Sequence, residues 1–398
     1  MRRLTLALGL VLTVAAFGAV KAADDPRMVS GWDHFYNLEF DAAMADFAAA
    51  SKAYPQDADI HNNIAQALLY REMLRNGALE SELVSGVDSF LRKPKMNPTP
   101  EEQKRFDYEL NRAISMAQAA LQKNPNDVTA LYSLGVSYGL RSNYNFLVRK
   151  AWRDSLRDAT EASKMHNRVT ALQPGNYDAR LTQGIHEFVV GSLPWHLRTL
   201  GFLMGFHGDK EGGLRTIQDV AKKGERNRVD AEIVLCVLYR REQRYKDAIP
   251  LLNDLLRRYP RDYLFEFEKA QMYSALGNKK EALAAIERVA ELKESGAAGF
   301  SAVPWEKIYY QEANIQFWYN DLDAALANMK KVTSDPKDLD LSTGVLAYMR
   351  QGQIHDLQHK HDLAIADYKQ AIAFAPEAEA AKESERYIRE PYRRGKAS

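Results

Sequence analysis

The chain has 398 residues, of which 46% are hydrophobic and 27% are charged, so it holds enough apolar material for a large folded core and is not a disordered protein. Its 54 lysines and arginines nearly balance its 53 aspartates and glutamates, and this balance disfavours a nucleic-acid-binding function. The single cysteine excludes a framework of intrachain disulfides and any metal site built from several cysteines.

The first 22 residues have the pattern of a secretion signal. Two arginines follow the initiator methionine, and an apolar run of 17 residues from Leu4 to Val20 leads to a small-residue cleavage motif. The pattern predicts residues 1–22 as a signal peptide, an exported chain that starts near Ala23, and a periplasmic or secreted location. An uncleaved membrane anchor is the alternative, although the run is at the short limit for crossing a bilayer. After cleavage we expect no transmembrane span.

From residue 23 onward the sequence repeats a pair of amphipathic helices. Within units of about 34 residues, a small residue recurs at position 8, an alanine at position 20, a large apolar residue at position 24 and a proline at position 32. This spacing resembles the tetratricopeptide repeat (TPR), a helix–turn–helix unit. The residues at position 8 are Gly31, Ala65, Gly135, Gly184, Cys236, Ala270, Ala313 and Gly352.

The pattern predicts an all-α fold, a right-handed TPR-type solenoid of about eight units that forms one domain over residues 23–395. The two helices of a unit must cross closely at position 8, and a larger side chain there would force them apart. The spacing is irregular at 71–105, which we interpret as a degenerate helix and a loop, and near 141–160 and 189–213, which we interpret as inserts. The polar stretch 377–392 is predicted to be a capping helix.

The middle of the chain carries a second resemblance. GSLPWHLRTLGFLMGFHGDKEGG (191–213) combines an apolar segment with a glycine-rich turn, and in this it resembles the inclusion-body-clearance family of eukaryotic TPR proteins over about residues 184–290. The resemblance implies a TPR fold and a recruiting role, without assigned catalytic residues. The matching residues are Leu193, Pro194, Gly205, Phe206, Gly208, Asp209, Lys210 and Gly213.

The motifs of enzymes are not found, so we predict no catalytic activity and no cofactor. GFHGDKEGG (205–213) lacks the residue order of a phosphate-binding P-loop, and Cys236 falls at a position expected to be buried. The cluster of His355, His359 and His361 is interpreted as a solvated turn between helices. A metal site is the weaker alternative, because two histidines four residues apart can share a helix face.

Residues 189–206 form the most apolar segment after the signal. It is interpreted as an insert folded against the solenoid, with two alternatives: the wall of a pocket for a small apolar ligand, or a segment in peripheral contact with a membrane. Either alternative would depend on Trp195, Leu200, Phe202 and Phe206.

The concave side of a TPR solenoid is lined by the first helix of each unit, and resemblance to the family implies which positions point into this groove. Asparagine and glutamine can bond to a peptide backbone, arginine can bind a carboxylate, and aromatic residues can anchor a partner. Some of these residues could instead pack against the neighbouring unit. The candidate groove residues are Asn62, Gln66, Tyr70, Tyr132, Arg240, Arg241, Phe267, Gln271, Tyr310, Asn314, Phe317 and Trp318.

Two functional hypotheses follow. The first is an exported, non-catalytic TPR scaffold that binds a protein or peptide, and no nucleic acid, in its concave groove. The second is a carrier or sensor of a small apolar ligand that uses residues 189–206 as a pocket wall. The sequence does not define the oligomeric state.

Overall fold

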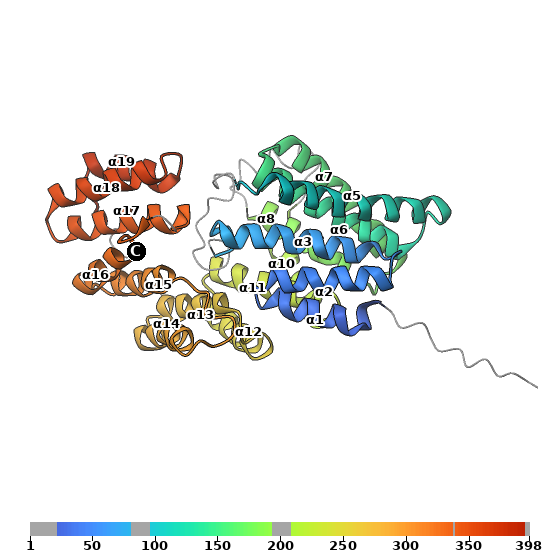
Figure 1. The fold of residues 1–398 in the computed structure, drawn as a ribbon, viewed down its shortest axis with the longest axis horizontal. Coiled ribbons are helices and arrows are strands. Elements are labelled where there is room, and N and C mark those ends of the chain that lie inside the picture. Colours follow the sequence, from blue (N-terminus) through green and yellow to red (C-terminus); the bar gives the residue numbers. More distant parts are fainter. Residues whose placement is uncertain (1–21, 81–95, 193–207, 337–338, 395–398) are drawn as a thin grey trace, which may run out of the picture.

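The computed structural model describes residues 22–80, 96–192, 208–336 and 339–394. Within these ranges the chain forms helices and no strand, and the helices follow one another as eight antiparallel pairs (Figure 1). The predicted all-α solenoid of the TPR type is therefore confirmed.

Each pair consists of a first helix, called the A helix, and a second, called the B helix. The A helices are α1 (Pro26–Tyr36), α3 (Ala58–Arg75), α6 (Val128–Tyr144), α8 (Leu181–Gly191), α11 (Arg228–Arg241), α13 (Tyr263–Ala275), α15 (Trp305–Trp318) and α17 (Leu341–Leu357). The B helices are α2 (Phe40–Ala53), α5 (Pro100–Lys123), α7 (Trp152–Leu172), α10 (Lys210–Lys223), α12 (Tyr245–Arg258), α14 (Lys279–Glu294), α16 (Leu322–Val332) and α18 (His361–Phe374).

The irregular parts of the sequence lie between or inside these pairs. In the second unit, α3 continues to Arg75, the three-residue α4 (Ala78–Glu80) follows, and α5 begins at Pro100 behind a capping box formed by Thr99 and Glu102. Residues 141–160 are largely helical, because α6 passes into a π-helical turn, η4 (Asn145–Arg149), and α7 begins three residues later. The extra length of the third unit is therefore taken up by long helices and a tight turn. After the last pair, the polar stretch forms α19 (Glu379–Arg389).

The two helices of a unit touch where position 8 faces position 24. A Cβ atom added to Gly31 would lie 2.7 Å from Cδ1 of Phe47, and one added to Gly352 would lie 2.6 Å from Cδ1 of Tyr368. Both rings are fully buried. Since real Cβ atoms do not approach other atoms so closely, the small residues are required for the helices to cross at this distance.

The third unit departs from this pattern because it places a histidine where the other units place an apolar side chain. His166 on α7 is buried against Gly135 of α6, and neither of its ring nitrogens forms a well-defined hydrogen bond. Burial lowers the pKa of His166 to about 4, although the backbone of Tyr132 lies near enough to oppose this shift. The ring is therefore neutral in the folded protein at physiological pH.

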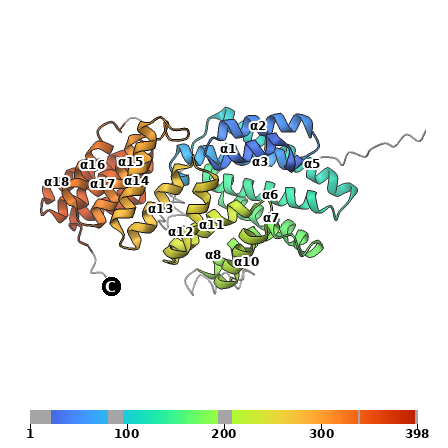
Figure 2. The same cartoon turned by 90° about the horizontal axis from the view of Figure 1, so that it is seen from below.

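The first unit also contacts the middle of the chain, at the turn between α12 and α13 (Figure 2). The backbone amide of Arg261 donates to Oδ1 of Asn37 at 2.8 Å, and its guanidinium donates to Glu39 at 2.8 Å and to Asp33 at 2.6 Å. The pKa of Glu39 lies below its usual value: burial alone would raise it, but the hydrogen bonds from Arg261 and His34 outweigh burial. Residues more than 220 positions apart are thus joined.

Two glycines one turn apart on α6 allow a direct test of the close helix crossing. Gly135→Ala should destabilise the protein by about 1–3 kcal/mol, because the new methyl group would press on the ring of His166. Gly139→Ala should stabilise it by up to about 1 kcal/mol, because a Cβ there meets nothing within 4 Å and alanine favours the helix. Urea unfolding measures both, and equal effects of the two variants would contradict the close crossing.

The neutral His166 predicts a dependence of stability on pH. Its pKa is lower in the folded chain, so the unfolded chain takes up the proton first, and stability should fall as pH drops from about 6.5 toward about 4. His166→Leu should raise stability by about 1–3 kcal/mol at pH 5 by removing a buried polar ring. Unfolding curves at pH 7.5 and pH 5 provide the measurement. A variant that loses as much stability as the parent over this range would rule out His166 as the cause.

Candidate functional site

The A helices α13, α15 and α17 follow one another on the side of the C-terminal half that faces the N-terminal helices, with α14, α16 and α18 on the outer side (Figures 1 and 2). The surface that these helices form together with α11 is called the A-helix face. It is the structural counterpart of the predicted groove in the last four units. The residues considered on it are Arg240, Gln271, Tyr310, Asn314, Trp318 and Arg350.

A series of polar contacts links the A helices of successive units. Arg240 on α11 pairs with Glu268 on α13 at 2.5 Å, and Nε2 of Gln271 donates to Oε1 of Gln311 on α15 at 2.9 Å. Burial raises the pKa of Glu268 to about 8, against the opposing charge of Arg240. These side chains therefore fix each unit on its neighbour.

Several predicted groove residues are used internally. Phe267 and Phe317 are fully buried in the core and are not available to a partner. Asn62 is also buried: its amide donates to the backbone oxygen of Ser133 at 2.9 Å, and its Oδ1 accepts from Ser137 at 2.7 Å. The position rule selects residues by the side of the A helix on which they lie. It does not take into account the curvature of the solenoid, which brings the next A helix against them.

Trp318 is the exception among the predicted aromatic residues. It ends α15, and 56% of its surface is exposed. Arg350, which the sequence analysis did not select, lies beside it: the guanidinium carbon of Arg350 is 5.3 Å from the centroid of the Trp318 ring. Half-buried Tyr310 and buried Asn314 lie on the same helix as Trp318, and the Asn314 amide donates to the backbone oxygen of Tyr310 at 3.0 Å.

The remaining candidates lie in different surroundings. Tyr70 and Gln66 are half-buried on α3, and the ring of Tyr70 lies 5.2 Å from that of Phe35. Arg241, at the end of α11, is exposed. These residues belong to separate parts of the solenoid and do not form one site.

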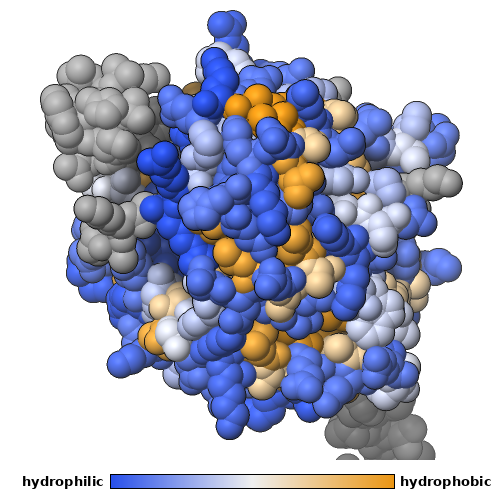
Figure 3. Space-filling model, turned by 90° about the vertical axis from the view of Figure 1, so that its left-hand side faces the viewer, coloured by the Kyte–Doolittle hydropathy of each residue, from blue (hydrophilic) through white to orange (hydrophobic). Residues whose placement is uncertain are grey.

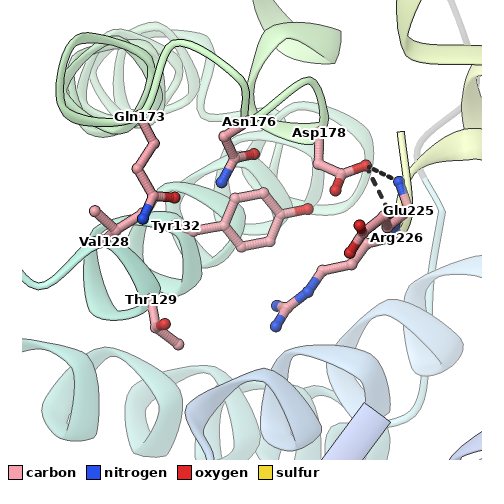
Figure 4. Close-up of a pocket in the computed structure, with 8 residues that line it drawn as sticks. All are labelled: Val128, Thr129, Tyr132, Gln173, Asn176, Asp178, Glu225 and Arg226. Atoms are coloured by element: carbon pink, nitrogen blue, oxygen red, sulfur yellow. Dashed lines mark hydrogen bonds between the residues drawn. The ribbon is translucent and has the colours of Figure 1, made fainter. Parts of the chain in front are cut away.

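Tyr132 lines a cavity of about 200 Å³ in the N-terminal half (Figure 4). The guanidinium of Arg226 lies 5.3 Å from the centroid of its ring, and burial raises the pKa of Tyr132 above its usual value. Asp178 closes one side, where its Oδ1 accepts from the backbone amides of Glu225, Arg226 and Asn227 at 3.0–3.1 Å. Because Arg226 also pairs with an aspartate on α3, its charge is already compensated.

The glycine-rich motif in the middle of the chain builds a close crossing of α8 and α10. Asp209 caps α10 by accepting from the amide of Gly212 at 2.9 Å, and Lys210 pairs with Glu242 behind α11. A Cβ on Gly213 would lie 2.5 Å from the backbone nitrogen of Phe188. Asp209, Lys210 and Gly213 of the motif therefore have a structural role. Its other members, Leu193, Pro194, Gly205 and Phe206, lie outside the described residues.

The histidine cluster is divided among separate partners. Nδ1 of His355 lies 2.6 Å from Asp367, and Nδ1 of His361 lies 2.6 Å from Asp356, whereas His359 occupies a turn with φ of 61°. In the described ranges, no group of three or more histidine, cysteine, aspartate or glutamate residues is arranged to hold a metal ion.

Two further predictions can be compared with the structure. Cys236 is buried, and burial raises the pKa of its thiol well above the usual range, so it fits position 8 and not a nucleophile. The apolar candidates Trp195, Leu200, Phe202 and Phe206 lie outside the described residues, so the pocket and membrane interpretations of 189–206 stay predictions. Of the helices in the described ranges, none combines the length and apolar character needed to cross a membrane.

Comparison with known families agrees with this structure. Residues 153–298 match the family model described as Iml2/Tetratricopeptide repeat protein 39, and residues 29–72 match a tetratricopeptide repeat model. The chain is therefore a TPR protein whose middle region resembles the Iml2 family, as the two resemblances in the sequence predicted. Repeats of this type support a protein-interaction scaffold, and families built from them are generally non-catalytic. Among curated proteins, none matches the sequence.

Three solved structures with a similar fold are distant in sequence from this chain. A human IFIT1 dimer with m7Gppp-AAAA shares 13% identity, covering 94% of this chain and 83% of that one, with a TM-score of 0.47. Yeast Tom70 shares 12% identity, covering 92% and 88%, with a TM-score of 0.41. A tetratricopeptide repeat protein from Parabacteroides merdae shares 15% identity, covering 77% and 91%, with a TM-score of 0.33. At these identities the likeness concerns the fold alone.

The pairing of Arg240 predicts that this residue stabilises the solenoid. Arg240→Ala should lower the free energy of unfolding by about 2–4 kcal/mol, because it leaves the carboxyl group of Glu268 buried without its partner. The double variant Arg240→Leu/Glu268→Leu should recover most of this loss. Arg241→Ala, at the exposed neighbouring position, should change stability by less than about 1 kcal/mol. Urea unfolding tests all three, and a stable Arg240→Ala variant would return Arg240 to the list of binding residues.

Proposed function

We propose that this protein is an exported, non-catalytic scaffold that binds a protein or peptide partner on the A-helix face of its last four units. The observation that carries the proposal is Trp318, a large aromatic residue that is 56% exposed on an A helix whose other aromatic residues are half-buried or buried. Aromatic residues of this kind anchor interfaces, because they bury a large area at a small cost in side-chain freedom.

The surroundings of Trp318 favour a polypeptide as the partner. Arg350 lies beside Trp318 and supplies a guanidinium of the type that binds acidic side chains, while the buried side chains of Asn314 and Gln353 hold this guanidinium in place. Figure 3 shows the opposite, outer end of the C-terminal half, where hydrophilic residues predominate and hydrophobic residues form a broken band between them. Export rests on the signal pattern of residues 1–22.

Site-specific photocrosslinking in the cell of origin tests this proposal. A benzophenone amino acid placed at Trp318 should yield an adduct of defined mass with a partner protein, because a partner on the A-helix face would contact this position. The same amino acid at Leu363, which is 52% exposed on the B helix α18, is the matched control and should yield no such adduct. Tryptic mass spectrometry of the product should also find a mature chain that starts near Ala23.

Three outcomes would contradict the proposal. Equal labelling at positions 318 and 363 would rule out a specific A-helix face. The absence of any adduct at position 318 would rule out a partner there. A chain that retains residues 1–22 and stays in the cytoplasm would rule out export.

A further inference from the structure

Among the residues that the structure describes, no acidic side chain pairs with the positive charge of Arg350. Its Nε donates to Oδ1 of Asn314 at 3.2 Å, and its Nη1 donates to Oε1 of Gln353 at 2.9 Å. The guanidinium carbon lies 4.1 Å from the centroid of the Phe317 ring and 5.3 Å from that of Trp318. All of these partners are neutral, and the side chain is half-buried.

A second arginine reaches the same ring from the segment that follows α19. Nη2 of Arg394 donates to the backbone oxygen of Phe317, and its guanidinium carbon lies 4.9 Å from the Phe317 centroid. Its Nε is buried and has no hydrogen-bond partner. Two cations therefore lie beside one phenylalanine ring, and one of them has a buried donor that is not used.

Neither arginine forms an ion pair within the described ranges. This contrasts with Arg141, which is similarly half-buried and is paired with Asp158 at 2.7 Å. Burial lowers the pKa of Arg350, nearby tyrosines oppose this effect, and the charge of Arg394 lowers the pKa further. Like charges that are held together in a partly buried place disfavour the unliganded state, and an anion between them would relieve the repulsion.

The carboxylate of Asp356, at the end of α17, is not the anion that relieves the repulsion between Arg350 and Arg394. Its Oδ1 lies 2.6 Å from Nδ1 of His361, while its Oδ2 accepts from the hydroxyl of Tyr368 at 2.7 Å and from the backbone amide of Tyr392 at 2.7 Å. These contacts hold the segment after α19 in place. Asp356 thus helps to position the segment that carries Arg394, while both of its own oxygens are occupied by other hydrogen bonds.

We propose that Arg350 and Arg394 bind a carboxylate of an acidic peptide segment, and that Trp318 contacts an apolar residue next to it. Guanidinium groups bind carboxylates through paired, charge-assisted hydrogen bonds, and the unused donors here include Nε of Arg394. The inference rests on the proposed function and names the chemistry of the partner that the A-helix face takes.

A carboxylate fits this site better than a nucleic acid does. Binding of a nucleic acid requires a row of cations that follows the phosphates, and here two arginines stand together. Arg240, on α11 three units earlier, is already paired with Glu268. The nearly equal numbers of acidic and basic residues in the chain provide no wider positive field.

Selection from a random decapeptide display library, followed by fluorescence anisotropy of individual labelled peptides, tests the inference with the full-length protein. The selected peptides should be enriched in aspartate or glutamate next to an apolar residue. Changing that acid to its amide should weaken binding about tenfold or more, as loss of a charge-assisted pair does. Arg350→Gln and Arg394→Gln should each weaken binding of the acidic peptide to the same degree.

Arg393→Gln is the matched control, because it removes the same charge from the adjacent, exposed position and should change the affinity less than about twofold. Circular dichroism should show that all three variants are folded. The thermal midpoint of Arg350→Gln should stay close to that of the parent, since the substitution removes repulsion but also the donor to the buried oxygens of Asn314 and Gln353.

The outcomes separate this inference from the proposed function. Selected peptides without acidic preference that lose binding in Trp318→Ala would overturn the carboxylate site and keep the scaffold. Acidic peptides that bind Arg350→Gln and Arg394→Gln as tightly as the parent would overturn the site as well. Binding of a single-stranded RNA decamer that requires both arginines, with no selected peptide, would overturn both proposals. Peptides unaffected by Trp318→Ala would overturn the proposed A-helix face.

Discussion

The close crossing of the two helices in each unit is the constraint on which the structure depends. Position 8 carries no side chain larger than alanine or cysteine, and position 24 of the B helix fills the space with a large group such as Phe47 or Tyr368. This contact sets the geometry of each pair, and the pairs set the curvature that determines which surface of every A helix meets its neighbour. The polar contacts between units therefore follow from a packing requirement inside the units.

The sequence predicted the repeat because its signal is local. Glycine or alanine at position 8 and the proline at position 32 can be counted along the chain, and the structure has eight pairs at the expected places. Contacts between distant units leave no such periodic signal. Nothing near Arg261 indicates that it bonds to Asn37 and Glu39, because that contact arises only when the accumulated rotation of several units brings the first unit back to the middle of the chain.

The candidate site was predictable to a smaller extent for the same reason. Trp318, Phe267 and Phe317 all satisfy the position rule, but Trp318 is exposed and the two phenylalanines are buried, so position alone does not decide which side chain is accessible. Arg350 was missed because an arginine on a helix is ordinary in sequence. Its significance lies in the lack of a carboxylate partner within the described part of the chain and in its neighbour Arg394 from the segment beyond the last repeat, neither of which a local pattern reveals.

The position of the two arginines at the end of the solenoid also bears on how a ligand would act. In a repeat array each unit contacts mainly its neighbours. A ligand that stabilises the last unit therefore also stabilises the preceding unit and the capping helix. Arg394 is held through Tyr392, whose backbone amide bonds to Asp356 and whose ring lies 6.3 Å from that of Phe317. An anion bound between the arginines would therefore join the last A helices to the terminal segment and stabilise the end of the array, where a solenoid otherwise has a neighbour on one side alone.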